Sequence, residues 1–122
     1  MTDNLQPLRI FYLEDNPLIV FHVEAMIEDL GHVFAGTADS FADLKRIFDA
    51  IEADGTLVDI DLADGRTGIA AAEWLGGKGM PVLFVTGQEG IAAEHSKLAL
   101  GLVRKPVSAR DLAAKLRLFR RE

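Results

Sequence analysis

The amino-acid sequence predicts an α/β protein in which one parallel sheet is covered by helices on both faces. A length of 122 residues suits one domain, and short apolar runs alternate with amphipathic stretches five times along the chain. Regular alternation of strands and helices implies parallel pairing, because each helix carries the chain back to the start of the next strand. We therefore expect a single domain over residues 1–122, with five strands and five helices.

The five strands are predicted from the apolar runs. The first run is nearly continuously apolar, as expected of a strand buried on both faces. The predicted ranges are 8–13, 33–37, 56–60, 81–86 and 100–104. A doubly wound sheet with five strands most simply takes the flavodoxin-like order 2-1-3-4-5, which we therefore predict.

Capping residues delimit the first, second and fifth helices. Asn16 is a predicted N-cap followed by Pro17 at the first helical position, and Gly31 ends that helix. The second and fifth helices begin with the Ser-x-x-Asp spacing of a capping box, which occurs at Ser40 with Asp43 and at Ser108 with Asp111.

The third and fourth helices are predicted to be short. The third follows a polar loop over residues 64–68 and runs through 70–75, where a cluster of three glycines at positions 76, 77 and 79 ends it. The fourth is predicted at roughly 91–98.

Composition excludes several classes of protein. A formal net charge of −6 disfavours nonspecific binding to DNA or to anionic membranes, which carry the same sign. No apolar run is long enough to cross a membrane, and the polar N-terminus argues against a signal peptide. The absence of cysteine excludes disulfides, thiolate metal sites and cysteine nucleophiles. We therefore expect a cytoplasmic protein that binds neither nucleic acid nor membrane.

Polar residues follow four of the five predicted strands at their carboxyl ends. Glu14 and Asp15 follow the first strand, Asp59 lies near the end of the third, Thr86 ends the fourth and Lys105 follows the fifth. Ligands of doubly wound sheets bind outside this edge. One such residue alone would be an ordinary turn or cap residue, but four strand ends agree, so we expect one functional site.

The chemistry of this set favours magnesium-dependent phosphoryl transfer to a carboxylate. Three neighbouring carboxylates repel one another, and a divalent cation together with the Lys105 ammonium group would compensate that repulsion. Mg²⁺ prefers carboxylate, carbonyl and water oxygens. A metal ion and an ammonium group also suit the charge of a phosphoryl group, to which Thr86 could donate a hydrogen bond.

Four short motifs together resemble those of the receiver domains of two-component response regulators. They are Glu14-Asp15-Asn16, Val58-Asp59-Ile60-Asp61-Leu62, Val85-Thr86-Gly87 and Arg104-Lys105-Pro106. The resemblance covers residues 9–118 and implies that Asp59 accepts a phosphoryl group from the phosphohistidine of a sensor histidine kinase. It implies that Thr86 and Lys105 hold phosphoryl oxygens and relay the signal. It also implies a Mg²⁺ site, formed by Asp15 directly, Glu14 through water, Asp59, and the backbone carbonyl of Asp61.

Two departures from the family pattern concern signal relay. The family usually has an aromatic residue three positions before the lysine, and here that position is Leu102. The usual coupling between a moving threonine and a turning aromatic ring therefore does not carry over. The stretch between Thr86 and Lys105 is also short, which predicts an abbreviated fourth helix.

The segment Phe84-Val85-Thr86-Gly87 is similar to the Phe-Ala-Thr-Gly signature of a subgroup of single-domain regulators common in alphaproteobacteria. Gln88 and Glu89 do not continue that motif. The subgroup resemblance implies histidine kinases of the HWE or related families as partners.

The resemblance implies an output through other proteins. The chain ends directly after the fifth helix, so we expect no output domain and a signal passed by contact with a downstream protein. We expect no enzymatic activity beyond catalysis of its own phosphorylation and dephosphorylation. Three alternatives stay open: a phosphate sink that drains a kinase, a phosphatase with Asp61 as its acid/base group, and a phosphorylation-independent binding module, which Leu102 would allow.

Overall fold

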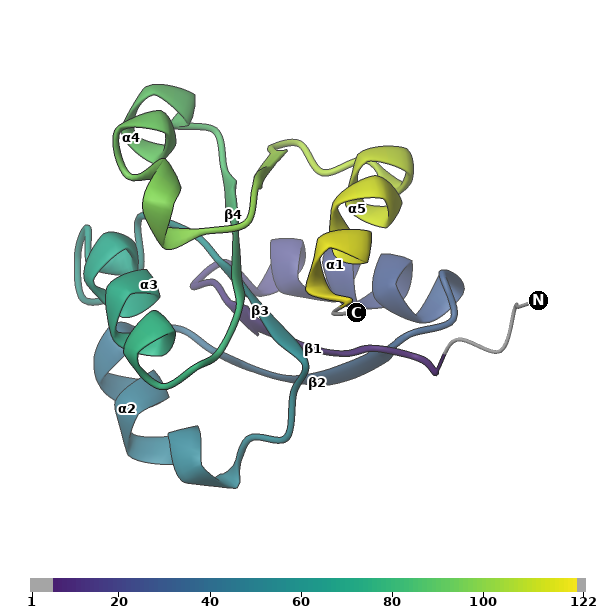
Figure 1. Ribbon diagram of the computed structural model, residues 1–122, viewed down its shortest axis with the longest axis horizontal. Coiled ribbons are helices and arrows are strands. Elements are labelled where there is room, and N and C mark those ends of the chain that lie inside the picture. The colour runs from purple at the N-terminus through teal and green to yellow at the C-terminus, as the bar shows by residue number, and fades with distance from the viewer. Residues whose placement is uncertain (1–5, 121–122) are drawn as a thin grey trace.

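The computed structural model describes residues 6–120, which form a parallel five-stranded sheet between two layers of helices (Figure 1). The order β2-β1-β3-β4-β5 and the predicted fold class are confirmed. The strands are β1 (Arg9–Leu13), β2 (Val33–Ala38), β3 (Gly55–Val58), β4 (Val82–Thr86) and β5 (Leu102–Arg104).

The helices divide between the two faces of the sheet and enclose two hydrophobic cores. Helices α1 (Pro17–Asp29) and α5 (Ala109–Leu116) cover one face, and α2 (Phe41–Ile47), α3 (Gly68–Gly77) and α4 (Glu89–Glu94) cover the other. Alternate residues of β1 enter different cores: Ile10 and Tyr12 pack under α1 and α5, whereas Phe11 and Leu13 pack under the other helices. This double burial explains the continuous apolar run of the first strand.

The predicted N-caps are confirmed. The Asn16 side-chain oxygen accepts the backbone N–H groups of Leu18 at 3.0 Å and Ile19 at 3.4 Å. The hydroxyl groups of the two capping serines accept backbone N–H groups three residues later, Ser40 from Asp43 at 2.9 Å and Ser108 from Asp111 at 3.1 Å.

Several predicted boundaries were wrong. Strand β3 ends at Val58, so Asp59 lies in the loop that follows it. Helix α3 continues through Gly76 and Gly77, and the chain leaves the helical course at Gly79, whose φ of 80° is left-handed. The glycines at 76 and 77 are exposed and keep helical dihedrals, so composition alone misplaced this end.

The segment between β4 and β5 is abbreviated, as expected. Helix α4 has six residues and begins two residues earlier than predicted, and the rest of the predicted range holds a short 3₁₀ turn at Ser96–Leu98. A similar turn, Phe48–Ala50, follows α2. Within residues 6–120 no helix combines the length and apolar character that crossing a bilayer requires.

Candidate functional site

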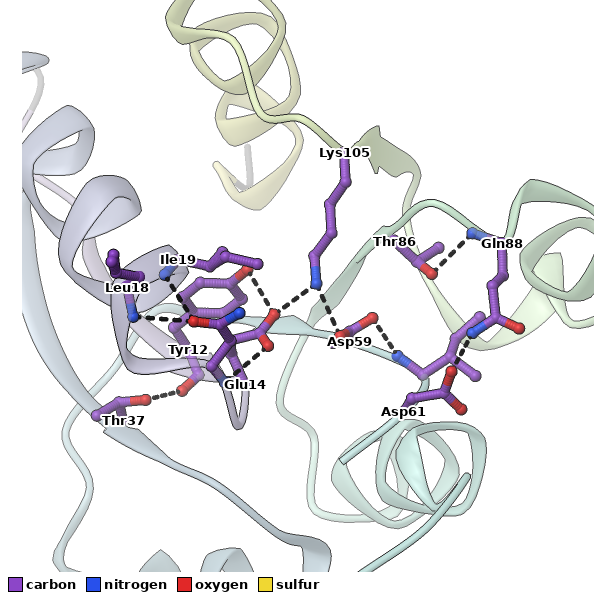
Figure 2. A network of polar contacts seen from close by, with 12 residues as sticks. Tyr12, Glu14, Leu18, Ile19, Thr37, Asp59, Asp61, Thr86, Gln88 and Lys105 are labelled. Carbon is purple, nitrogen blue, oxygen red and sulfur yellow. Dashed lines mark hydrogen bonds and ion pairs between the residues drawn. The ribbon is translucent and has the colours of Figure 1, made fainter. Parts of the chain in front are cut away.

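The predicted site residues meet at the carboxyl edge of the sheet (Figure 2). Glu14 follows β1, Asp59 follows β3, Thr86 is the last residue of β4, and Lys105 follows β5. Parallel pairing places these four strand ends at one edge, so residues up to 91 positions apart come into contact. Carboxylate oxygens of Glu14, Asp15 and Asp59 all lie within 4.8 Å of one another.

Lys105 connects the two buried carboxylates of this cluster. Its Nζ donates to Glu14 Oε1 at 2.7 Å and to Asp59 Oδ2 at 2.8 Å. Glu14 is 3% exposed and Asp59 6%, and buried carboxylates are normally paired with a cation or a metal ion. Burial opposes the charge of Lys105, but hydrogen bonds and charges from both carboxylates outweigh burial and raise the Lys105 pKa. The ammonium group therefore stays charged and offsets one of the two negative charges.

Glu14 is also held by neighbours on its own segment. The Tyr12 hydroxyl donates to Glu14 Oε1 at 3.2 Å, and the backbone N–H of Asn16 donates to Oε2 at 3.0 Å. Burial, reinforced by the Glu14 charge, raises the pKa of Tyr12, which keeps its hydroxyl protonated as a donor. Sequence reasoning missed Tyr12 because it lies in an apolar run. Its position two residues before Glu14, on the same side of the strand, was the available signal.

Both oxygens of Asp59 have partners. Oδ1 accepts the backbone N–H of Ile60 at 2.7 Å, and Oδ2 accepts from Lys105. The first residue of α3, Gly68, donates its N–H to the Ile60 carbonyl at 2.9 Å. A Cβ at Gly68 would overlap the backbone carbonyl oxygen of Asp59, so only glycine permits this approach. The start of α3 thus positions the Asp59 backbone.

Asp15 and Asp61 lie at the exposed rim of the site. Partial desolvation, together with a hydrogen bond and charge from Glu14, raises the pKa of Asp15. The Asp61 carboxylate lies outside the acidic cluster, because it accepts hydrogen bonds from the side chains of Gln88 and, at 3.0 Å, Arg66. The cluster of Glu14, Asp15 and Asp59 offers oxygen ligands only, which fits Mg²⁺.

Thr86 lies at the end of β4 and is 1% exposed. Its hydroxyl oxygen accepts the backbone N–H of Gln88 at 3.0 Å. Sequence reasoning treated Gln88 only as a departure from a motif, and no sequence signal linked it to Asp61, which lies 27 residues earlier. A carboxylate, a fixed ammonium group and a hydroxyl group at the same edge of the sheet can together receive and hold a phosphoryl group.

Comparison with known proteins identifies the family of this chain. The family described as "Response regulator receiver domain" matches residues 10–117. The phyllosphere-induced regulator PhyR of Methylorubrum extorquens is 33% identical over 109 residues, which cover 86% of this chain and 40% of that protein. The chain thus spans less than half the length of that curated relative.

Two solved structures have the same fold over most of this chain. The receiver domain of Erythrobacter litoralis PhyR is 29% identical, with a TM-score of 0.82, over 93% of this chain and 89% of that one. The anti-anti-sigma factor PhyR of Bartonella quintana is 27% identical, with a TM-score of 0.83, over 95% of this chain and 48% of that one.

Proposed function

The chain belongs to the response regulator receiver domain family, and from that premise we propose that Asp59 accepts a phosphoryl group from the phosphohistidine of a sensor histidine kinase. The observation that carries this proposal is the placement of Asp59. It is a nearly buried carboxylate at the carboxyl edge of the sheet, held 2.8 Å from a fixed ammonium group. An Asp59 oxygen would attack phosphorus, the phosphorus–nitrogen bond would break, and the imidazole would leave with a proton.

The other residues of the site have distinct roles in this proposal. Lys105 would hold one phosphoryl oxygen, and Thr86 would donate its hydroxyl hydrogen to another. Glu14, Asp15, Asp59 and the backbone carbonyl of Asp61 would hold Mg²⁺, which when bound neutralises charge on the phosphoryl oxygens. Tyr12 and the Asn16 backbone position Glu14.

An exposed apolar surface on α1 supports a protein as the phosphodonor. Leu18 and Phe21 are 67% and 75% exposed on the helix that begins directly after the acidic residues. A groove beside Leu18 runs between α1 and the segment Lys105–Val107 and is lined mainly by apolar side chains. A kinase domain that covers this surface would bring its phosphohistidine beside Asp59. We propose a kinase of the HWE or a related family, on the strength of the subgroup resemblance.

The proposed output is contact with a downstream protein, made by this chain as a single receiver domain. The similarity to the Bartonella quintana protein, which is named an anti-anti-sigma factor, supports an output through protein contact. A phosphoryl group adds charge at the edge of the sheet and would shift an existing conformational equilibrium there.

The test is phosphotransfer profiling against the histidine kinases of the source organism. We expect wild type to acquire an acid-labile label in the presence of Mg²⁺ and Asp59→Asn to acquire none. Asp61→Asn is the matched control, since it changes a neighbouring aspartate whose carboxylate lies outside the cluster, and it should still be labelled. Full labelling of Asp59→Asn would refute the proposal.

A further inference from the structure

The Asp64 side chain joins the loop that follows Asp59 to the start of α2. Its Oδ1 accepts the backbone N–H of Phe41 at 3.2 Å, and its Oδ2 accepts that of Ala42 at 3.1 Å. These are the first two residues of α2, so their N–H groups have no acceptor within the helix. A carboxylate 22 positions beyond Ala42 in the chain therefore caps this helix.

Two further hydrogen bonds fasten the same loop. The Thr67 hydroxyl donates to Asp64 Oδ1 at 2.6 Å, which fixes the carboxylate within its own loop. The backbone N–H of Ala63 donates to the carbonyl of Asp39 at 2.8 Å, just before α2. The loop is thus bound to the β2–α2 connection through the Asp64 side chain and, next to it, through the backbone of Ala63.

The backbone carbonyl of Asp61 differs from those of its two neighbours in this loop. The carbonyl of Ile60 accepts the N–H of Gly68 at 2.9 Å, and that of Leu62 accepts the N–H of Gly65 at 3.0 Å. Within residues 6–120 the Asp61 carbonyl between them accepts no backbone N–H. A backbone carbonyl needs a partner, and Mg²⁺ takes carbonyl oxygens as ligands. This carbonyl, two residues beyond a carboxylate of the acidic cluster, is therefore available to a cation.

We propose that Asp64 is a positioning residue for the Mg²⁺ site, because it fastens to α2 the loop that carries the Asp61 carbonyl. This inference rests on the proposed function, in which that carbonyl is one of the oxygen ligands. Asp64 acts through the loop and not as a ligand, since its own oxygens already accept hydrogen bonds from Phe41, Ala42 and Thr67. Hydrogen bonds to a carboxylate are stronger than those between neutral groups, so together the three oppose movement of the loop.

The side chain of Asp61 does not replace this hold on its backbone. Gln88 and Arg66 donate to the Asp61 carboxylate, but rotatable bonds separate that carboxylate from the backbone carbonyl. Of the hydrogen bonds that join this loop to the β2–α2 connection in the described residues, only that of Ala63 would remain without Asp64. The loop could then turn about this single attachment, which would change the direction of the Asp61 carbonyl relative to the acidic cluster.

The experiment measures Mg²⁺ affinity of the whole chain by titration calorimetry at an ionic strength of about 0.15 M, and stability by the urea midpoint of unfolding. Asp64→Ala removes all three contacts of the carboxylate. It should bind Mg²⁺ about tenfold more weakly than wild type, the lower end of the effect of removing a group that orients a metal ligand. Its acid-labile phosphoryl labelling should return to the wild-type level when the Mg²⁺ concentration is raised about tenfold, because Asp59 and Lys105 are unchanged.

Ser40→Ala is the matched control for the loss of a helix cap. The Ser40 hydroxyl accepts the N–H of Asp43 at 2.9 Å in the same first turn of α2, so this variant loses a cap of the same helix and keeps the Asp64 contacts. Its urea midpoint should fall, whereas its Mg²⁺ affinity should match that of wild type.

Asp39→Asn is the control for charge. It removes one negative charge, as Asp64→Ala does, from an exposed side chain that lines the same groove as Glu14 and Asp15. The backbone contact between Asp39 and Ala63 stays in place. Because salt screens exposed charges, Mg²⁺ affinity should fall less in Asp39→Asn than in Asp64→Ala.

The outcomes separate the positioning role of Asp64 from the proposed function. If Asp64→Ala binds Mg²⁺ as tightly as wild type, or if either control variant weakens binding as much, the positioning role is refuted while the phosphoacceptor role stands. If wild type neither binds Mg²⁺ nor acquires a phosphoryl label, the proposed function fails and this inference fails with it.

Discussion

The polar side chains at the two ends of the sheet differ in whether they also bond to other side chains. At the amino edge, polar side chains bond to the backbone: His32 Nδ1 accepts the N–H of Leu8 at 3.0 Å, and Asp54 accepts the N–H of Arg9 at 2.8 Å. At the carboxyl edge, Glu14 and Asp59 also accept backbone N–H groups, but the Lys105 side chain bonds to both of them.

The difference teaches how to separate structural from functional polar groups. A side chain that satisfies a backbone N–H stabilises the fold, because that group would otherwise lose its hydrogen bond to water. Buried carboxylates within 4.8 Å of each other destabilise it unless a cation compensates. A cluster whose members compensate mainly one another therefore indicates a ligand site.

The largest expected effect comes from a matched pair of glycine substitutions, one at each edge. A Cβ at Gly55 would lie 2.5 Å from the ring of Phe119, and a Cβ at Gly68 would overlap the Asp59 backbone. We expect each alanine variant to lower the free energy of unfolding by about 3 kcal/mol, as measured by urea denaturation. Gly68→Ala should also lose most phosphoryl labelling, because it displaces Asp59, whereas Gly55→Ala should keep it. Equal phosphoryl labelling of the two folded variants would contradict the functional difference between the two edges of the sheet.

Removing the cation of the carboxyl edge should have the next largest effect. Lys105→Met leaves Glu14 and Asp59 without their counter-charge and should lower the free energy of unfolding by about 2 kcal/mol in the absence of divalent ions. Added Mg²⁺ should restore most of that loss in thermal unfolding, because the cation replaces the ammonium charge.

Lys115→Met is the control for this prediction. Lys115 Nζ donates to the Leu102 carbonyl at 2.7 Å and lies 3.0 Å from Asp111, away from the acidic cluster. Its stability should not depend on Mg²⁺ more strongly than that of wild type, and a Mg²⁺ rescue of both variants would contradict the prediction.

Tyr12→Phe should have a smaller effect, because it removes one of several partners of Glu14. The loss of one buried hydrogen bond should cost about 1 kcal/mol in chemical denaturation. Mg²⁺ affinity, measured by titration calorimetry, should fall only a few-fold, since Lys105 and the Asn16 backbone still hold Glu14. A complete loss of Mg²⁺ binding would show that Tyr12 does more than position Glu14.

The smallest effect concerns the amino edge and pH. Burial, with a contribution from Arg120, lowers the pKa of His32 from its usual 6.5, so the unfolded chain binds this proton more readily than the folded protein. Stability that depends on neutral His32 is complete above pH 6.5 and is lost as the pH falls from there through the lowered folded value. His32→Gln should flatten this part of the curve of melting temperature against pH. An unchanged slope would mean that protonation of His32 is not linked to unfolding in this pH range.

The elements with strong local signals were predicted well from the sequence. The caps at Asn16, Ser40 and Ser108 were correct because each depends on a hydrogen bond to a residue two or three positions away. The end of α3 was misplaced because several glycines compete as breakers there, and the left-handed dihedral falls on Gly79. Only backbone geometry distinguishes these glycines.

The candidate site was predicted in its members but not in its contacts. Glu14, Asp59, Thr86 and Lys105 were expected together because each lies at the carboxyl end of a strand of one parallel sheet. The Lys105 charge was expected to compensate the carboxylates, but its simultaneous contact with Glu14 and Asp59 and the two-ended bonding of Gln88 were not expected, since these contacts join loops far apart in the chain.

The sequence by itself determined the fold class and the types of residue at the carboxyl edge, because apolar periodicity, caps and strand-end positions are local properties. The strand order was predicted as the simplest arrangement for a sheet of this kind, and the observed pairing confirms it. Only the tertiary structure decided which residues touch: that Lys105 bonds to both Glu14 and Asp59, that Tyr12 is part of the site, and that Gln88 connects Thr86 to Asp61. The reason is that such contacts depend on loop conformations and side-chain rotamers, which are set when separate strands pack side by side.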